Sequence, residues 1–510
     1  MPKPFDFGEV NLAAGQDSSG ARPEPETPFC VAILGDFSGR AQRASSAEPI
    51  SKRRAILIDR DNFDEVLQKF GVEIQLPIGD SGSSRLRFAE LEDFHPDRVF
   101  EHLDAFRKLR DLRARVQDPA TFEAAAKELG LRSKGEANAQ AQASEGSPII
   151  SPSATRLASG SLLDEMIEQT ESQAPEDRPK RSTDEVREFA RRVAEPHLVS
   201  APDPRQAEII SVLDRAIGAL MRAVLHNSDF QALESGWRAV YFLVRRLETG
   251  SNLKLYLLDI SKEELAADLR MAPDLRHAAI YRLLVEKSAE AGADPWALIV
   301  GNYVFGLEKR DVEFLSRMAQ VAHRADATFL AEASPQLLGF DPSEPRPHTE
   351  KTLESIGDWA GLRHLQEAGS LGLALPRFLL RLPYGKKTSP VESFDFEEFP
   401  ELPRHEDYLW GDPAFVVALL LAQSFSESGW EMRPGTVSDL DGLPLHIYQR
   451  DGDSEAKTCA EILMTDEEVD QILSAGIMPL ISFRGSDKVR LARFQSIADP
   501  VRGLSGRWMR

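Results

Sequence analysis

The sequence predicts an α/β fold with mixed and parallel sheets flanked by helices, in two packed halves joined by a flexible linker. From residue 253 onward, short apolar runs typical of buried strands alternate with stretches of helical periodicity, which favours a largely parallel sheet. Two more strand-like runs lie before residue 60. Between these regions, residues 131–158 are rich in Ala, Gln, Ser, Gly and Pro, a composition typical of linkers.

The chain length supports more than one domain, because 510 residues exceed what one ordinary core holds. We expect an N-terminal domain over 1–130 and a C-terminal domain over 184–510. The linker, over 131–183, carries a short amphipathic helix at 161–172. The N-terminal domain alone has few short strands and a marginal core, so we expect the two halves to pack on each other.

The elements of the N-terminal half follow from its apolar spacing. Asp61 or Asn62 is expected to cap the first helix by accepting backbone N–H bonds. In order, we predict strands at 30–34 and 55–58, a helix at 61–70, a hairpin of 72–78 with 85–88, a long helix at 96–116 and a short helix at 119–129.

The C-terminal half shows denser apolar patterning. Ser261-Lys-Glu-Glu264 is a capping box that begins a helix. We predict helices at 209–226, 230–246 and 311–325, a buried helix at 414–422, and strands at 253–260, 296–300, 328–332, 378–382, 445–447 and 459–464. The run from Phe378 to Gly385 is either a strand that enters a sharp turn at an interface or an ordinary core strand.

The composition of the chain argues against several classes of partner. A formal net charge of −21 argues against a nucleic-acid partner and against an anionic membrane surface. No apolar run approaches the roughly 20 residues that a membrane helix needs, and the first residues lack a signal peptide. We therefore expect a soluble cytoplasmic protein. Cys30 and Cys459 lie in apolar runs and are expected to be buried free thiols, a disulfide between them being the alternative.

Candidate chemical sites are few. Gly35-Asp-Phe-Ser-Gly39 follows a strand, as phosphate loops do, but lacks the Gly-Lys-Ser/Thr ending, so we favour a tight turn in which Asp36 bonds the loop backbone. Metal-ligand spacings and a Gly-x-Ser-x-Gly elbow are absent from the sequence. The pair Glu397-Glu398 is expected in an exposed acidic loop. The sequence thus predicts no enzyme, no cofactor and no metal.

Several motifs carry a resemblance to the contractile sheath proteins of type VI secretion systems. Residues 29–130 resemble the small sheath subunit, TssB or VipA, and residues 161–510 resemble the large subunit, TssC or VipB. The first resemblance rests on Ile33-Leu-Gly-Asp-Phe-Ser-Gly39, Ile58-Asp-Arg-Asp-Asn-Phe-Asp-Glu-Val66, Leu91-Glu-Asp-Phe-His-Pro96 and Leu109-Arg-Asp-Leu-Arg113. The second rests on Ser161-Leu-Leu-Asp-Glu165, His226-Asn-Ser-Asp-Phe-Gln-Ala-Leu-Glu234 with Trp237-Arg238, Ile260-Ser-Lys-Glu-Glu-Leu265, Leu375-Pro-Arg-Phe-Leu-Leu-Arg-Leu-Pro-Tyr-Gly385, Tyr408-Leu-Trp-Gly411 and Ile477-Met-Pro-Leu480.

The resemblance implies a structural function in assembly. In that family the two subunits form a heterodimer that stacks into a tube, and contraction of the tube drives an inner needle. The implied partners are copies of itself or other sheath subunits, the inner needle tube, baseplate proteins and, where one is used, a AAA+ unfoldase. By motif position, the helix at 161–172 is the one an unfoldase grips, with Leu162, Leu163, Met166 and Ile167 as its apolar contact residues.

Two departures from the family leave two interpretations open. Fusion of the two subunits fixes their ratio at one to one. The sequence also stops at Arg510, before the strands with which the family's large subunits link their neighbours. One interpretation is a fused structural sheath subunit that polymerises. The alternative is a non-polymerising adaptor that caps the sheath or docks it to the baseplate.

The amphipathic helix gives a direct test. Leu163→Asp places a charge in its apolar stripe, so it should abolish unfoldase binding in a pull-down while the thermal unfolding midpoint stays unchanged. A fall of many degrees in that midpoint would instead assign the helix to the protein's own core.

Overall fold

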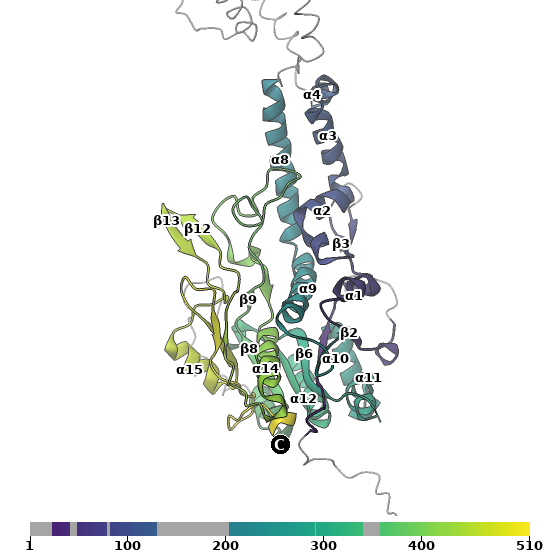
Figure 1. Cartoon of the computed structure of the whole chain (residues 1–510), viewed down its shortest axis with the longest axis vertical. Coiled ribbons are helices and arrows are strands. Elements are labelled where there is room, and N and C mark those ends of the chain that lie inside the picture. Colours follow the sequence, from purple (N-terminus) through teal and green to yellow (C-terminus); the bar gives the residue numbers. More distant parts are fainter. Residues whose placement is uncertain are drawn as a thin grey trace, which may run out of the picture. The chain divides into compact units, whose positions relative to one another are not determined.

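The computed structural model describes residues 23–40, 48–78, 82–129, 203–290, 292–339 and 357–509 (Figure 1). We call residues 23–129 the N-terminal part and residues 203–509 the C-terminal part. The chain divides into two compact units, which are described separately. The larger unit holds residues up to Arg107 and from Arg215 onward, and the smaller one holds Lys108–Asp214.

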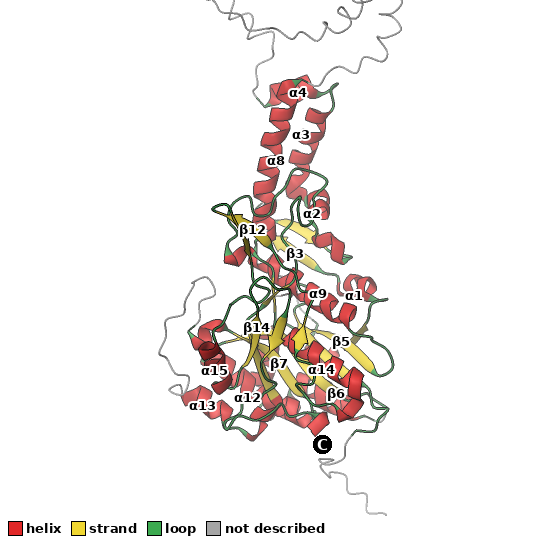
Figure 2. Ribbon diagram, turned by 60° about the vertical axis from the view of Figure 1, so that its left-hand side comes forward, coloured by secondary structure: helices red, strands yellow, loops and turns green. Residues whose placement is uncertain are grey.

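A nine-stranded sheet is the centre of the larger unit (Figure 2). Its strand order is β11-β15-β14-β8-β7-β6-β1-β5-β2. Strands β5, β1, β6, β7, β8 and β14 run parallel to one another, while β2, β15 and β11 pair antiparallel. The predicted α/β fold with mixed and parallel pairing is therefore confirmed. The strands of this sheet are β1 (Phe29–Gly35), β2 (Ile56–Ile58), β5 (Leu253–Asp259), β6 (Trp296–Phe305), β7 (Thr328–Ala333), β8 (Leu371–Leu375), β11 (Asp439–Leu440), β14 (Met478–Ser482) and β15 (Val489–Leu491).

The N-terminal part supplies an inner strand of this sheet. Strand β1 lies between β5 and β6, with Phe29 opposite Leu253 and Cys30 opposite Trp296. All seven residues of β1 are buried. Because β5 and β6 bond to opposite edges of β1, the sheet of the C-terminal part is continuous only when β1 is present. The expectation of two packed halves is met by this shared sheet.

Helices cover both faces of the sheet. Cys30, Ala32 and Leu34 belong to the core cluster that includes residues of α10, α11, α12, α13 and α15. Phe29 instead packs against Phe425 of α14, with ring centroids 4.8 Å apart. Since successive strand residues point to opposite faces, α14 lies on the other face, and α9 packs beside it. The helices are α1 (Phe63–Phe70), α2 (Pro96–His102), α3 (Arg107–Gln117), α4 (Phe122–Glu128), α8 (Pro204–Leu225), α9 (Ser228–Arg246), α10 (Lys262–Met271), α11 (Ala279–Tyr281), α12 (Lys309–Arg324), α13 (Gly357–Arg363), α14 (Ala414–Ser428) and α15 (Asp466–Ser474).

Several local predictions are confirmed. Ser261 and Glu264 form the expected capping box at the start of α10, each side chain accepting the other's backbone N–H. The predicted hairpin is β3 (Glu73–Leu76) paired antiparallel with β4 (Ser84–Arg87). The expected buried helix is α14, whose first nine residues are all buried.

The predicted long helix over 96–116 is wrong, because the chain breaks at Leu103. Its backbone is extended, and a 3₁₀ turn over Asp104–Phe106 separates α2 from α3. The break buries Leu103 and Phe106 completely, and the Phe106 ring lies 5.4 Å from Phe100. Periodicity alone did not reveal that these apolar residues need a turn between them to reach the core.

The predicted cap of α1 is also wrong. Asn62 occupies the N-cap position without a side-chain bond to the helix. Its carboxamide oxygen accepts the Asp59 N–H (2.9 Å), and its amide nitrogen donates to the Leu57 carbonyl (3.2 Å). Asp59 Oδ1 accepts the N–H groups of Asp61 and Asn62. These polar groups stabilise the turn between β2 and α1 rather than the helix end.

Three strand predictions in the C-terminal part need correction. The strand over 378–382 shrinks to β9 (Phe378–Leu379), which pairs with β10 (Trp410–Gly411). The strand over 445–447 begins later, as β12 (Ile447–Arg450), and pairs with β13 (Asp453–Ala456). At 459–464 no strand forms; Ala460 makes one isolated bridge to Phe378.

The smaller unit joins helices of both parts of the chain. Its apolar cluster contains Val116, Phe122, Ala125, Ala126, Ile209 and Leu213. The Gln206 amide donates to the carbonyls of Val116 (2.7 Å) and Gln117 (2.9 Å), and Arg113 pairs with Asp214 at 2.7 Å. Residues of α8 thus pack against residues of α3 and α4.

Other expectations concern residues outside the described ranges. They are the predicted linker over 131–183 and the predicted helix at 161–172. The domain boundaries therefore stay predictions. Within the described ranges, no helix combines the length and apolar character that crossing a membrane requires.

The shared sheet predicts the behaviour of a divided chain. Residues 1–129 and 203–510, coexpressed as two polypeptides, should copurify as an equimolar complex, because β5 and β6 both bond to β1. Fragment 203–510 expressed without its partner should show a lower thermal midpoint or aggregate, since the edges of β5 and β6 are then unpaired. Two well-folded fragments that ignore each other on mixing would contradict this.

Candidate functional site

The candidate site is the interface between the N-terminal and C-terminal parts within the larger unit. Its first element is the loop that follows β1. Asp259, at the end of β5, accepts the backbone N–H groups of Phe37 (2.9 Å) and Ser38 (3.1 Å) with Oδ1, and its Oδ2 lies 2.7 Å from the Arg40 guanidinium. The loop amides that a phosphate would need are thus already bonded to a carboxylate.

The expected turn is confirmed inside this loop, where Asp36 Oδ1 accepts the Arg40 N–H at 2.8 Å. Gly39 is required at its end, because its φ is +71° and a Cβ there would lie 2.5 Å from the Glu73 carbonyl oxygen. Burial raises the pKa of Asp259, and the Arg40 guanidinium opposes that rise. The loop therefore depends on a carboxylate from the other part of the chain.

Trp237 of α9 is the second element of the interface. Its indole N–H donates to the Phe37 carbonyl at 2.8 Å, and the side chain is fully buried. The rings of Phe37, Phe63 and Phe70, all from the N-terminal part, lie 5.6–5.8 Å from the indole at steep angles. Such edge-to-face contacts add to the stabilisation from burial alone.

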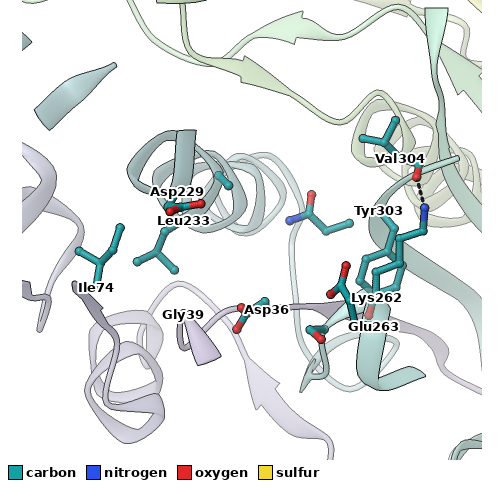
Figure 3. Close-up of a pocket in the computed structure, with 12 residues that line it drawn as sticks. Asp36, Gly39, Ile74, Asp229, Leu233, Lys262, Glu263, Tyr303 and Val304 are labelled. Atoms are coloured by element: carbon teal, nitrogen blue, oxygen red, sulfur yellow. Dashed lines mark hydrogen bonds between the residues drawn. The ribbon is translucent and has the colours of Figure 1, made fainter. Parts of the chain in front are cut away.

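A cavity of about 330 Å³ opens beside this loop (Figure 3). Asp36, Gly39 and Ile74 line one side, and α9, the start of α10 and β6 line the others. Lys262 is already engaged, since its ammonium group donates to the Val304 carbonyl (2.5 Å) and lies 2.8 Å from Asp311. The lining residues from the C-terminal part are Asp229, Ala232, Leu233, Ser261, Lys262, Glu263, Asn302, Tyr303 and Val304.

The third element of the interface is a set of contacts between α2, with the residue before it, and the segment after β9. Asp97 accepts the backbone N–H groups of Glu392 (3.1 Å) and Ser393 (2.9 Å), and the His95 ring meets Tyr384 edge-on at 4.9 Å. Burial raises the pKa of Asp97, but the bonds from Ser393 and Glu392 outweigh it and lower the pKa. Of the two alternatives for 378–385, the structure shows a short strand that enters a turn at an interface.

A buried ionic network supports that turn. Arg381 donates to Glu234 of α9 (2.9 Å) and to Glu398 (2.8 Å). Arg238 donates to the same Glu234 (2.6 Å) and to the Tyr384 hydroxyl (3.0 Å). The network therefore fixes α9 and the turn in one arrangement, and both carry residues that contact the N-terminal part.

The expectation that Glu397-Glu398 lies in an exposed acidic loop is wrong for Glu398, which is 1% exposed. Its carboxylate accepts the Tyr384 N–H at 2.8 Å as well as both Arg381 bonds. Burial alone would raise the pKa of Glu398, but the nearby Arg381 charge and these hydrogen bonds lower it to about 2. Glu397, its neighbour, stays exposed.

Cys30 and Cys459 are buried free thiols, and burial raises the pKa of Cys459 to about 11. Among the described residues, no group of three or more His, Cys, Asp and Glu side chains is arranged to hold a metal ion. The expected unfoldase-binding residues, which lie outside the described ranges, are Leu162, Leu163, Met166 and Ile167.

Comparison with known proteins finds a match for each of the two parts of the chain that form this interface. A protein-family model described as "EvpB/VC_A0108, tail sheath N-terminal domain" (VipB) matches residues 207–498, more than half of the chain. The chain belongs to this tail sheath family. A second model, "Type VI secretion system, VipA, VC_A0107 or Hcp2", matches residues 9–127. The predicted fusion is confirmed, because a VipA-type and a VipB-type region occur in one chain.

Two curated relatives come from Pseudomonas aeruginosa (strain PAO1). The chain is 34% identical over 305 residues to "Type VI secretion system sheath protein TssC1", covering 58% of this chain and 61% of the relative. It is 28% identical over 109 residues to "Type VI secretion system sheath protein TssB1", covering 20% of this chain and 62% of the relative. The chain thus spans about six tenths of each relative.

The low pKa of Glu398 gives a pH-dependent prediction. A carboxyl group whose pKa is lowered on folding stabilises the protein above its unfolded pKa, near 4.5, and loses that contribution as the pH falls toward about 2. Glu398→Gln should lower the free energy of unfolding by about 3–5 kcal/mol at pH 7, because it breaks a buried ion pair.

Denaturant titrations at several pH values measure this. The difference between wild type and Glu398→Gln should shrink from pH 5 toward pH 2. Glu397→Gln is the matched control and should change stability little at any pH. A Glu398→Gln deficit that stays constant with pH would contradict an ionised, paired Glu398.

Proposed function

We propose that this protein is a structural subunit of a type VI secretion contractile sheath, in which a small-subunit and a large-subunit region act as one chain. The observation that carries the proposal is the position of β1. A VipA-type strand fills the gap between two VipB-type strands, so the two regions make one folding unit rather than two tethered proteins.

The chemistry of the interface supports assembly rather than catalysis. Three buried or half-buried carboxylates of the interface, Asp259, Asp97 and Glu398, are bonded to backbone amides or to arginines. Lys262, in the cavity beside the loop, is held by Asp311 and Val304. Groups engaged in this way stabilise an arrangement of the backbone instead of acting on a substrate.

The partners follow from the same proposal. Other sheath subunits or further copies of this chain would pack around it, with the inner needle tube and baseplate proteins as further partners in the cytoplasm. The helix with Leu162, Leu163, Met166 and Ile167 would serve as the contact for an unfoldase. Covalent joining also keeps β1 at high effective concentration near β5 and β6, so the two regions stay in equal numbers.

The comparisons do not favour the adaptor alternative, because both regions of the chain match sheath proteins. It makes a different prediction, however, since an adaptor binds existing sheath ends without growing.

Electron microscopy of the purified full-length chain tests the proposal. Tubes with a regular helical repeat are expected, because each subunit would offer the same contacts to the next. Particles that stay single at high concentration, alone and with other sheath subunits from the same source, would overturn it. Particles found only at the ends of a preformed sheath would instead favour the adaptor.

A further inference from the structure

Two buried carboxyl groups lie close together where α14 begins. Glu332 is the last but one residue of β7, and Asp412 directly follows β10, two residues before α14. They are 4% and 5% exposed. Burial raises the pKa of Glu332 well above its ordinary range, and the nearby Asp412 charge raises it further. Two carboxylates enclosed in this way repel each other in surroundings that screen charge poorly.

Arg377, between β8 and β9, lies beside this pair, but its hydrogen bonds go to a third carboxylate. Its guanidinium is 3.9 Å from the Glu332 carboxylate, too far for a hydrogen bond. Its Nε donates to Glu461 at 3.0 Å, and its Nη2 donates to the same carboxylate. His405, with Lys457 3.4 Å from its other ring nitrogen, also contacts Glu461, at 2.8 Å. Burial alone would raise the pKa of Glu461, but the bonds from His405 and Arg377 lower it to about 2. Glu461 is therefore the carboxylate that Arg377 neutralises.

The hydrogen bonds of Asp412 satisfy only one of its two oxygens. Oδ1 accepts the Ala414 N–H at 2.8 Å, at the first turn of α14. Oδ2 is buried and has no hydrogen-bond partner among the described residues. A charged oxygen in that position loses its hydration without gaining a bond, which costs free energy. Protonation of the carboxyl group removes the charge and most of that cost.

The groups around the pair, taken together, favour a protonated carboxyl. Burial raises the pKa of Asp412 to about 8, although the Ala414 and Tyr303 N–H groups and the Arg377 charge oppose the rise. β6 and α14 present these N–H groups, and the charged groups beside the pair are the arginine and the third carboxylate described above. Because the pKa is higher in the folded chain than in the unfolded one, the folded chain binds more protons between about pH 4 and pH 8. Its stability should therefore fall as the pH rises through that window.

We propose that Glu332 and Asp412 together retain at least one proton at neutral pH, and that its loss in mildly alkaline solution loosens the start of α14. Release of the proton to water leaves two buried carboxylates beside an arginine that is bonded to a third. Movement of the turn at Asp412 away from β7 would let water reach these charges. Because α14 packs against β6, β7 and β8 and places Phe425 on Phe29 of β1, a looser start of α14 would weaken one face of the central sheet.

Infrared difference spectroscopy of the full-length chain tests the protonation. Between about pH 6.5 and pH 9 the wild type should lose the carbonyl stretching band of a protonated carboxyl group, because ordinary carboxylates are ionised at both values. The double variant Glu332→Gln/Asp412→Asn should lack this change, and each single variant should alter the amplitude of the band or the pH at which it is lost. Glu427→Gln replaces an exposed carboxylate near the other end of α14 and is the matched control, which should keep the wild-type spectrum.

Hydrogen exchange measured by mass spectrometry tests the loosening. For peptides covering 409–420, the exchange rate of the wild type divided by that of the double variant at the same pH should rise several-fold from pH 6.5 to pH 9. A wild type without the protonated-carboxyl band would overturn the proposal, whether or not the variants fold. A band that persists to pH 9, or that both single variants leave unchanged, would do the same, and a constant exchange ratio would overturn the loosening. Neither readout needs tube formation, so both are independent of the proposed sheath function.

Discussion

Backbone pairing of β1 with β5 and β6 is the constraint on which the rest of the larger unit depends. A parallel strand bonds through both of its edges, so an inner strand cannot be removed without leaving two rows of unsatisfied N–H and C=O groups. The fully buried sequence of β1 suits this position, because it packs against helices on both faces. The contacts made by Asp259, Trp237 and Asp97 all reinforce a placement that the strand pairing sets.

The polar contacts around β1 are buried, so each polar group is stable only while its hydrogen-bond or ion-pair partner stays in place. A carboxylate such as Glu398 is stable inside the protein only while Arg381 and the Tyr384 amide remain in place. The same holds for Asp259 and the loop amides. Each group therefore penalises arrangements in which its partner has moved, so the network contributes to the uniqueness of the fold as well as to its stability.

Much of the fold could be predicted from the sequence, because local patterns of apolar and helix-capping residues determine many of its strands and helices. Short apolar runs typical of buried strands revealed β1, β5 and β7, and the Ser261–Glu264 capping box marked the start of α10. The predictions that failed depended on side-chain packing and ion pairing in the folded protein rather than on local patterns. The burial of Glu398 is decided by Arg381, 17 residues earlier, whereas Glu397 beside it stays exposed. The break at Leu103 likewise follows from how Phe100 and Phe106 pack, which helical spacing cannot show.

The interface was predictable only in outline. The motifs around Phe37, Trp237 and Arg381 were visible in the sequence, but the role of Asp259 was not, because a single aspartate after a strand has no distinctive pattern. That the halves share one sheet, rather than merely touching, also needed the structure. Pairing partners separated by more than two hundred residues are set by the whole fold and leave no local trace.

The turn around Asn62 has a consequence for how the sheet ends. Strand β2 is its outermost strand on that side, and an exposed outer strand invites another chain to join it. β2 is only three residues long, and the Asn62 side chain already bonds the carbonyl of its middle residue, Leu57. The side of the sheet where β2 lies is thereby poorly suited to recruiting a foreign strand, so β2 does not offer an open template for aggregation.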